Sequence, residues 1–256
     1  VRSLAGIGLA QGLRLIIQEH PASDVVALHV WVGVGGRDEA PAERGFSHFA
    51  EHMLFKGTEH RAPGFVDREI ETVGGRTNAG TSWDYTVYYI LLPASQTVKG
   101  IEILSDMIFN SVFDERELAR EREVVFEEIR LGEDNPRSYL GRRLYELTFR
   151  GDTYGYPVLG DRDILRASSR ETLRGFYARH YVPDNLTLVV VGAVRPDEVR
   201  AAVARTFAAP PARGYRRPVP PAPRPLDESH REVRPRPERQ SSIGLAWLAP
   251  PLGERD

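Results

Sequence analysis

Residues 46–55, FSHFAEHMLF, restrict the possible folds of this chain more than any other stretch. The segment has the pattern of a mostly apolar helix that carries His48, Glu51 and His52. At about 100° per residue, His52 lies about 40° and Glu51 about 60° from His48, so the three ionisable side chains share one sector. Apolar residues bound this sector on both sides, which indicates an interior or a cleft. Unpaired burial there costs several kcal/mol, so the fold must bring a compensating group.

A metal ion would compensate these groups directly. Histidines at positions i and i+4 can place two nitrogens on one ion. A catalytic zinc ion commonly takes three protein ligands, often two His and one Glu, and keeps the fourth position for water. The alternative is that the two histidines and Glu51 satisfy one another and nearby backbone carbonyls. A third ligand elsewhere in the chain would favour the metal.

Candidates for a third ligand lie on a predicted helix at residues 115–131, with Asp114 as its N-cap. Glu121 and Glu128 lie on the shoulder of its apolar stripe, where a merely solubilising charge is less expected. Glu127 lies on the far side. The pattern therefore favours Glu128 or Glu121 as the ligand, and the other as a carboxylate that orients a histidine.

The remaining elements alternate between strand and helix patterns. Residues 6–19 and 25–34 are strand-like runs with a short turn between them, which predicts an antiparallel hairpin. Residues 76–92 are rich in Thr, Tyr and Val and predict one long strand, and residues 186–191 predict a buried strand.

Composition excludes several classes of protein and site. The chain has 256 residues, a formal net charge of −2 and no cysteine. There is no overall basic field to favour nucleic acid, and no disulfide, thiolate ligand or thiol nucleophile. No apolar run approaches the length of a membrane span. The sequence starts at Val1 rather than Met, so removal of an upstream segment is possible and a cytoplasmic and an exported location are not distinguished.

Several blocks of sequence, in order, resemble the pitrilysin and mitochondrial-processing-peptidase family of zinc metallopeptidases, the inverzincins, whose signature is H-x-x-E-H. The resemblance covers the N-terminal catalytic half of that family and extends to about Phe207. The blocks are GGRDE at 35–39, GFSHFAEHMLFKGT at 45–58, GGRTNAGTSWDYT at 74–86, EREVVFEEI at 121–129, YGYPVLG at 154–160 and YVPDNLTLVVVG at 181–192.

The resemblance implies a role for each residue of the motif. His48, His52 and Glu128 would bind one zinc ion per chain, and Glu51 would be the general base. Glu121 would take the supporting acidic position.

The resemblance also implies a substrate-binding strand beside the metal. Arg76, Thr77, Asn78 and Ala79 would form an edge strand to which the substrate backbone pairs. Independently, the lack of large side chains at Thr77, Ala79, Gly80 and Ser82 would let another backbone approach. An ordinary edge strand is the alternative reading.

The fold implied is α+β, with a largely antiparallel sheet and helices packed on one face, as in a processing-peptidase-like metallohydrolase domain. Composition changes at Pro210, and residues 210–237 hold 9 of the 19 prolines. This predicts a zinc-bearing half at 1–209 and a semi-rigid linker at 210–237. Residues 241–248 are strand-like, and 238–256 would begin a homologous second half that is not completed.

The function implied is a zinc-dependent endopeptidase that hydrolyses extended or unfolded peptides. Its partners would be the peptide substrate and a homologous second half or partner subunit. One alternative is a non-catalytic or partner-dependent subunit of a peptidase complex. Another is a metal-dependent hydrolase acting on a different carbonyl compound, which the predicted peptide-pairing strand disfavours.

Overall fold

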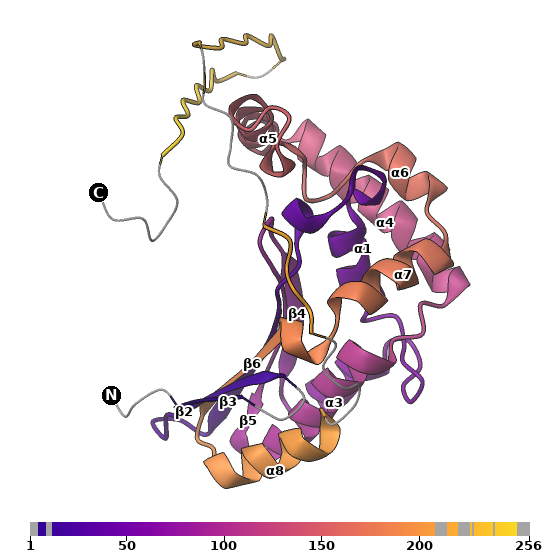
Figure 1. Cartoon of the computed structure of the whole chain (residues 1–256), viewed down its shortest axis with the longest axis vertical. Helices are drawn as coiled ribbons and strands as arrows, with labels where there is room; N and C mark the ends of the chain where they lie inside the picture. The colour runs from indigo at the N-terminus through magenta and orange to yellow at the C-terminus, as the bar shows by residue number, and fades with distance from the viewer. Residues whose placement is uncertain are drawn as a thin grey trace.

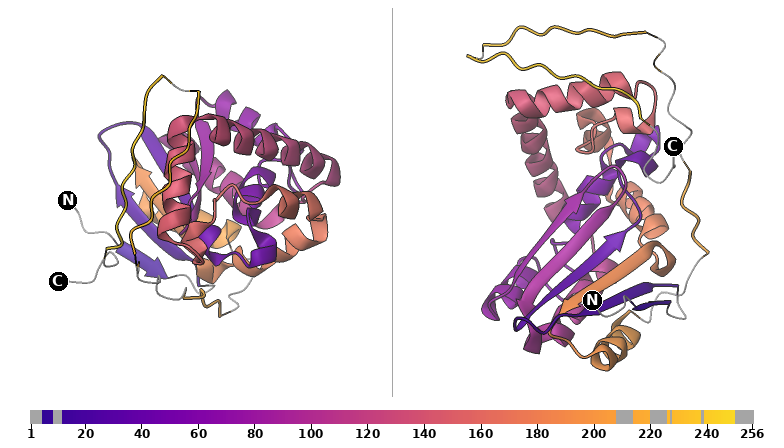
Figure 2. Two further views of the ribbon diagram at one scale, coloured as in Figure 1. Left: turned by 90° about the horizontal axis from the view of Figure 1, so that it is seen from above. Right: turned by 90° about the vertical axis from the view of Figure 1, so that its left-hand side faces the viewer.

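The computed structural model describes residues 5–8, 12–207, 214–219, 226, 228–237 and 239–249. These residues form a six-stranded sheet with helices packed on one face (Figures 1 and 2). The strand order is β1-β2-β6-β3-β5-β4, and every neighbouring pair is antiparallel except β2 and β6. The predicted α+β fold is therefore confirmed. The strands are β1 Ala5–Gly8, β2 Arg14–Glu19, β3 Val25–Val32, β4 Arg76–Thr81, β5 Thr86–Pro93 and β6 Leu186–Gly192.

The helices follow the periodicity of their apolar residues, and Asp114 caps the longest of them as predicted, accepting hydrogen bonds from the N–H groups of Arg116 and Glu117. Within the described ranges, none is long and apolar enough to cross a membrane. The α-helices are α1 Phe46–Met53, α2 Phe65–Thr72, α3 Thr97–Asn110, α4 Glu115–Asp134, α5 Pro136–Thr148, α6 Arg162–Ala167, α7 Arg170–His180 and α8 Pro196–Thr206. Short 3₁₀ turns are η1 Gly36–Asp38, η2 Pro41–Glu43, η3 Ala94–Gln96, η4 Thr153–Gly155 and η5 Pro183–Asn185.

The core lies between the sheet and the helices. Alternate residues of β3 are fully buried, including Leu28 and Val30, while those between them are partly exposed. Helix α1 contributes Phe49 and Met53, which are also fully buried. Burial of one sheet face and one helix stripe supplies the main driving force for this packing.

The predicted hairpin between residues 6–19 and 25–34 is wrong. β2 pairs with β1 and with β6, and β3 pairs with β5 and β6, so β6 lies between β2 and β3. The sequence of β6, LTLVVVG, has no charged residue, whereas β2 carries Arg14 and Glu19. The more apolar strand lies nearer the centre of the sheet, which pairing by sequence proximity does not anticipate.

The predicted single strand at 76–92 is two strands, β4 and β5, which pair as an antiparallel hairpin. Residues 82–85 form the turn, which is held by contacts from far away in the sequence. The N–H groups of Gly36 and Arg37 donate to the carbonyls of Ser82 and Trp83, each at 3.1 Å. A local pattern rich in β-forming residues cannot show such a turn.

The strand expected at residues 241–248 does not form in the structure, where 241–249 have no strand partner among the described residues. Ile243, Leu245 and Trp247 are largely exposed there. An alternating apolar pattern needs a neighbouring strand before it can form a ladder. The predicted boundaries of the linker and of a second half stay predictions.

Candidate metal centre

Helix α1 begins at a crowded point where two distant segments meet. Gly45 precedes it with a φ of 95°, and a Cβ added at Gly160 would lie 2.4 Å from the Gly45 Cα. The buried Glu39 carboxylate accepts hydrogen bonds from the N–H groups of Gly45 and Ser47, both at 2.7 Å. Burial raises the pKa of Glu39 to about 8, although these two N–H groups oppose the rise. Glu39 thus supplies the N-terminal cap of this helix.

Two helices bring three of the predicted site residues together. His48 and His52 lie on successive turns of α1, with ring centroids 4.7 Å apart. Glu128 comes from α4, which lies beside α1 (Figure 1). Its Oε2 lies 3.5 Å from His48 Nε2 and 3.6 Å from His52 Nε2. One donor atom from each residue lies within 4.8 Å of the other two.

These side chains fit a zinc ion. Two imidazole nitrogens and one carboxylate oxygen are the donor set of a catalytic zinc site that keeps one position for water. Burial and the neighbouring His52 lower the pKa of His48 to about 3, so its ring stays neutral and keeps a lone pair for a metal. His48 Nδ1 is buried and has no hydrogen-bond partner in the described structure, so Nε2 is the nitrogen that meets the rest of the site.

Glu121, the other candidate carboxylate, contacts the opposite nitrogen of His52. Glu121 Oε2 lies 3.0 Å from His52 Nδ1, and Glu121 Oε1 lies 2.9 Å from the ammonium group of Lys56. The Nδ1 contact orients the ring so that Nε2 faces Glu128. Sequence reasoning missed Lys56, although a position four residues after His52 is close to it in a helical turn.

Glu51 is near the three grouped side chains but is not one of them. Its Oε2 accepts a hydrogen bond from Thr81 Oγ1, at the end of β4. Burial raises the pKa of the Glu51 carboxyl, and the Thr81 hydrogen bond opposes this rise. A carboxylate beside a metal site but free of it can accept a proton. Thr81 was also missed, and its signal in the sequence is its place at the end of a run of small residues.

The four residues of the predicted substrate strand all lie on β4, one of the two edge strands of the sheet. Its far edge has no strand partner within the described residues. The side chains of Arg76 and Asn78 are exposed, whereas Thr77 donates to the Tyr89 carbonyl at 3.0 Å. Ala79 packs against the core. An unpaired edge next to Thr81 and Glu51 has the geometry for strand addition.

Two family profiles match this sequence. The profile described as Insulinase (Peptidase family M16) matches residues 14–162. The profile described as Peptidase M16 inactive domain matches residues 168–256. Both predicted ligand-bearing helices, α1 and α4, fall within the first match.

Individual proteins show the same similarity. An uncharacterized zinc protease of Bacillus subtilis, YmxG, is 37% identical over 183 residues, which is 72% of this chain and 45% of that protein. A probable mitochondrial-processing peptidase subunit beta of Arabidopsis thaliana is 31% identical, over 78% of this chain and 38% of that protein. The crystal structure of a protease from Helicobacter pylori has a TM-score of 0.81 at 26% identity and covers 86% of this chain and 54% of that one. The chain spans about half the length, or less, of the curated relatives it matches.

Proposed function

Because the chain belongs to the insulinase family of peptidases, family M16, we propose that it is a zinc-dependent endopeptidase acting on extended or unfolded peptides. The family and the names of its relatives indicate a zinc protease of the M16 type. The observation that supports the finer proposal is the convergence of His48, His52 and Glu128, with Glu51 close by but outside the group. These three residues would hold one zinc ion per chain.

Each side chain of the site then has a distinct task. A zinc ion held there would supply Lewis-acid activation of a water molecule and of the scissile carbonyl. Glu51 takes a proton from the attacking water and later gives it to the leaving amine. The Thr81 hydroxyl donates to Glu51 Oε2 and so orients the carboxylate for this proton transfer. Glu121 keeps His52 in the orientation that the metal requires.

The substrate would pair with the open edge of β4. Backbone N–H and C=O groups of an extended peptide can add to this edge as a further strand. Arg76, Thr77, Asn78 and Ala79 would provide this pairing, and the absence of a side chain at Gly80 leaves room for the added backbone. Such pairing needs an unfolded peptide segment, which favours peptides over other carbonyl compounds as substrates.

A second candidate function follows from the length of the chain. Its relatives are about twice as long or longer, and one of them is named as a subunit of a peptidase. The chain would then bind zinc but work only together with a homologous second half or a partner subunit.

One experiment separates the two functions. The 256-residue chain is loaded with zinc and incubated with a mixture of unstructured peptides, and the products are read by mass spectrometry. Cleavage that disappears with a chelator and in Glu51→Gln supports the endopeptidase. Retention of one zinc per chain without cleavage favours the partner-dependent subunit. Failure to bind zinc would refute both.

A further inference from the structure

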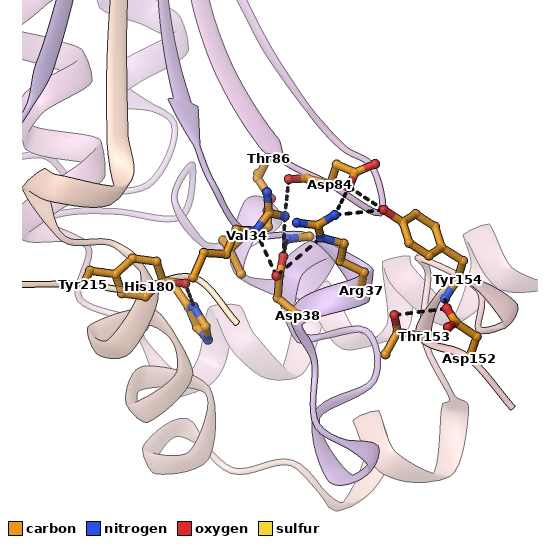
Figure 3. Close-up of polar contacts among 12 residues, drawn as sticks. Val34, Arg37, Asp38, Asp84, Thr86, Asp152, Thr153, Tyr154, His180 and Tyr215 are labelled. Carbon is orange, nitrogen blue, oxygen red and sulfur yellow. Dashed lines mark hydrogen bonds and ion pairs between the residues drawn. The ribbon is translucent and has the colours of Figure 1, made fainter. Parts of the chain in front are cut away.

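The Pro- and Arg-rich segment makes specific contacts with the folded domain. Its residues 214–219 include Tyr215, which lies beside the end of α7 (Figure 3). Tyr215 Oη lies 2.9 Å from His180 Nδ1, and the Tyr215 N–H donates to the Asp184 carboxylate. This part of the predicted linker is therefore attached to the domain rather than free of it.

Arg217 provides the charged part of this attachment. Its Nε and Nη2 donate to the two carboxylate oxygens of Asp38 at 3.0 and 2.7 Å. The Asp38 side chain is only 1% exposed. Asp38 also accepts a hydrogen bond from the Gly35 N–H at 2.9 Å and lies 3.7 Å from Arg37 Nε. Removing the main cation beside a buried carboxylate strongly destabilises a folded protein. The ion pair with Arg217 therefore stabilises the fold around Asp38.

Arg217 also reaches the turn that joins β4 to β5. Its Nη2 donates to the backbone carbonyl of Asp84. The Asp84 carboxylate in turn lies 2.8 Å from Arg37 Nη1 and accepts a hydrogen bond from the Tyr154 hydroxyl at 2.7 Å (Figure 3). One guanidinium group therefore links η1, which carries Asp38, to the turn at residues 82–85.

Two threonines flank this turn, and one of them contacts the proposed base. Thr81 precedes the turn, Thr86 follows it, and the two are paired across the strands. Thr86 Oγ1 donates to the Val34 carbonyl at 3.0 Å, while Thr81 donates to Glu51. Movement of the turn would therefore move the hydroxyl group that orients the Glu51 carboxylate.

We propose that Arg217 is a positioning residue for the peptidase reaction. It fastens the β4–β5 turn to η1 and so keeps Thr81 within hydrogen-bonding distance of Glu51. The catalytic part of this inference rests on the proposed function of Glu51, whereas the attachment of the turn does not. Residues 214–219, which were predicted to belong to a linker, would thus help to position the catalytic residues.

The attachment is tested by hydrogen–deuterium exchange, read by mass spectrometry on the 256-residue chain. In Arg217→Ala we expect the amides of residues 76–86 to exchange roughly tenfold faster. Arg216→Ala is the matched control, because Arg216 is an exposed neighbour and its loss removes the same charge. Arg217→Lys keeps a cation beside Asp38 and serves as the second variant in case Arg217→Ala does not fold. Its amides at residues 76–86 should exchange at a rate between those of the wild type and Arg217→Ala. Wild-type exchange rates in this segment in both Arg217 variants would overturn the proposal.

The catalytic role is tested by a double-mutant cycle with Thr81→Val. Arg217→Ala should lower kcat per zinc-loaded molecule roughly tenfold to a hundredfold and change KM little. The double variant should be no slower than Thr81→Val alone, because both changes release the same carboxylate. Additive losses would show that Arg217 does not act through Thr81. If the wild-type chain cleaves no peptide, the proposed function fails, while the exchange experiment still decides the attachment.

Discussion

At the scale of single residues, the site depends on which nitrogen of His52 is left for a metal. The Glu121 contact at Nδ1 leaves Nε2 facing Glu128, and Lys56 balances the charge of Glu121. A ring held in this way needs no reorganisation when a cation arrives. The affinity of the site for a metal should therefore depend on Glu121, although Glu121 would not contact the metal itself.

We expect Glu121→Gln to weaken zinc binding by roughly 10- to 100-fold, because Gln cannot hold the His52 ring with a full negative charge. Competition with a chromogenic chelator measures this affinity. Glu123→Gln on the exposed face of the same helix is the control. Equal zinc affinities for the two variants would contradict the orienting role of Glu121.

We expect Thr81→Val to lower kcat for peptide cleavage by roughly tenfold or more, since the Glu51 carboxylate loses its hydrogen-bond donor. Thr81→Ser keeps the hydroxyl group and should restore most of the rate. Steady-state kinetics and zinc content are measured for both variants. A Val variant as fast as the Ser variant would show that this hydrogen bond does not matter for the reaction.

The residue scale also shows what sequence alone can predict about the site. The i, i+4 spacing places His48 and His52 on one face whatever the rest of the fold does. The choice between Glu121 and Glu128 could not be made from a helical wheel, because it depends on how α4 lies against α1. Thr81 lies outside both helices, and its place at the end of a run of small residues does not show that its hydroxyl reaches Glu51, which depends on the folded sheet.

At the scale of elements, α1 is held at its N-terminus by a buried carboxyl group instead of an ordinary cap. Burial raises the pKa of Glu39 from its ordinary 4.5 to about 8. A group with a raised pKa in the folded state contributes its full stability below 4.5, and that stability is lost as the pH rises through about 8. The folded state should therefore lose stability on the alkaline side because the buried group must ionise there, even though the ionised carboxylate is the better acceptor for the Gly45 and Ser47 N–H groups.

We expect the free energy of unfolding of the wild type to fall relative to that of Glu39→Gln by up to about 1.4 kcal/mol per pH unit between the two pKa values. Urea unfolding of the metal-free proteins at a series of pH values measures this difference. Parallel pH profiles for the two proteins would mean that the Gly45 and Ser47 N–H groups cancel the effect of burial.

The elements themselves were predictable where their signals are local. Asp114 marks the start of α4, and the uncharged run at residues 186–191 marks β6, because caps and apolar patterns act over a few residues. The division of residues 76–92 into β4 and β5 was not predictable, since η1 and Arg217 hold the turn from distant parts of the sequence. The predicted pairing of β2 with β3 is wrong for a similar reason. The strand that separates them, β6, lies more than 150 positions later in the sequence than β3.

At the scale of the whole molecule, a bound metal would join α1 to α4 and so connect two helices of the same layer. Zinc that binds only the folded state stabilises it by mass action. At a free zinc concentration about 1,000 times the Kd, this amounts to about 4 kcal/mol.

We therefore expect zinc to raise the Tm of the wild type and a chelator to reverse the change. Glu128→Gln should lose most of this response. Glu127→Gln, which removes an exposed carboxylate one position away, should keep it. Differential scanning calorimetry measures the shifts. A zinc response that survives in Glu128→Gln would place the metal elsewhere.

The position of β6 has a consequence for how the chain is made. On the ribosome, β2 and β3 emerge long before residues 186–192, so the β6-facing edges of both strands stay without their partner until β6 has been made. Such edges can pair with strands of other chains, and closure by a distant strand is slow. A chaperone that shields these edges during synthesis should matter more for this domain than for one whose strands pair in chain order.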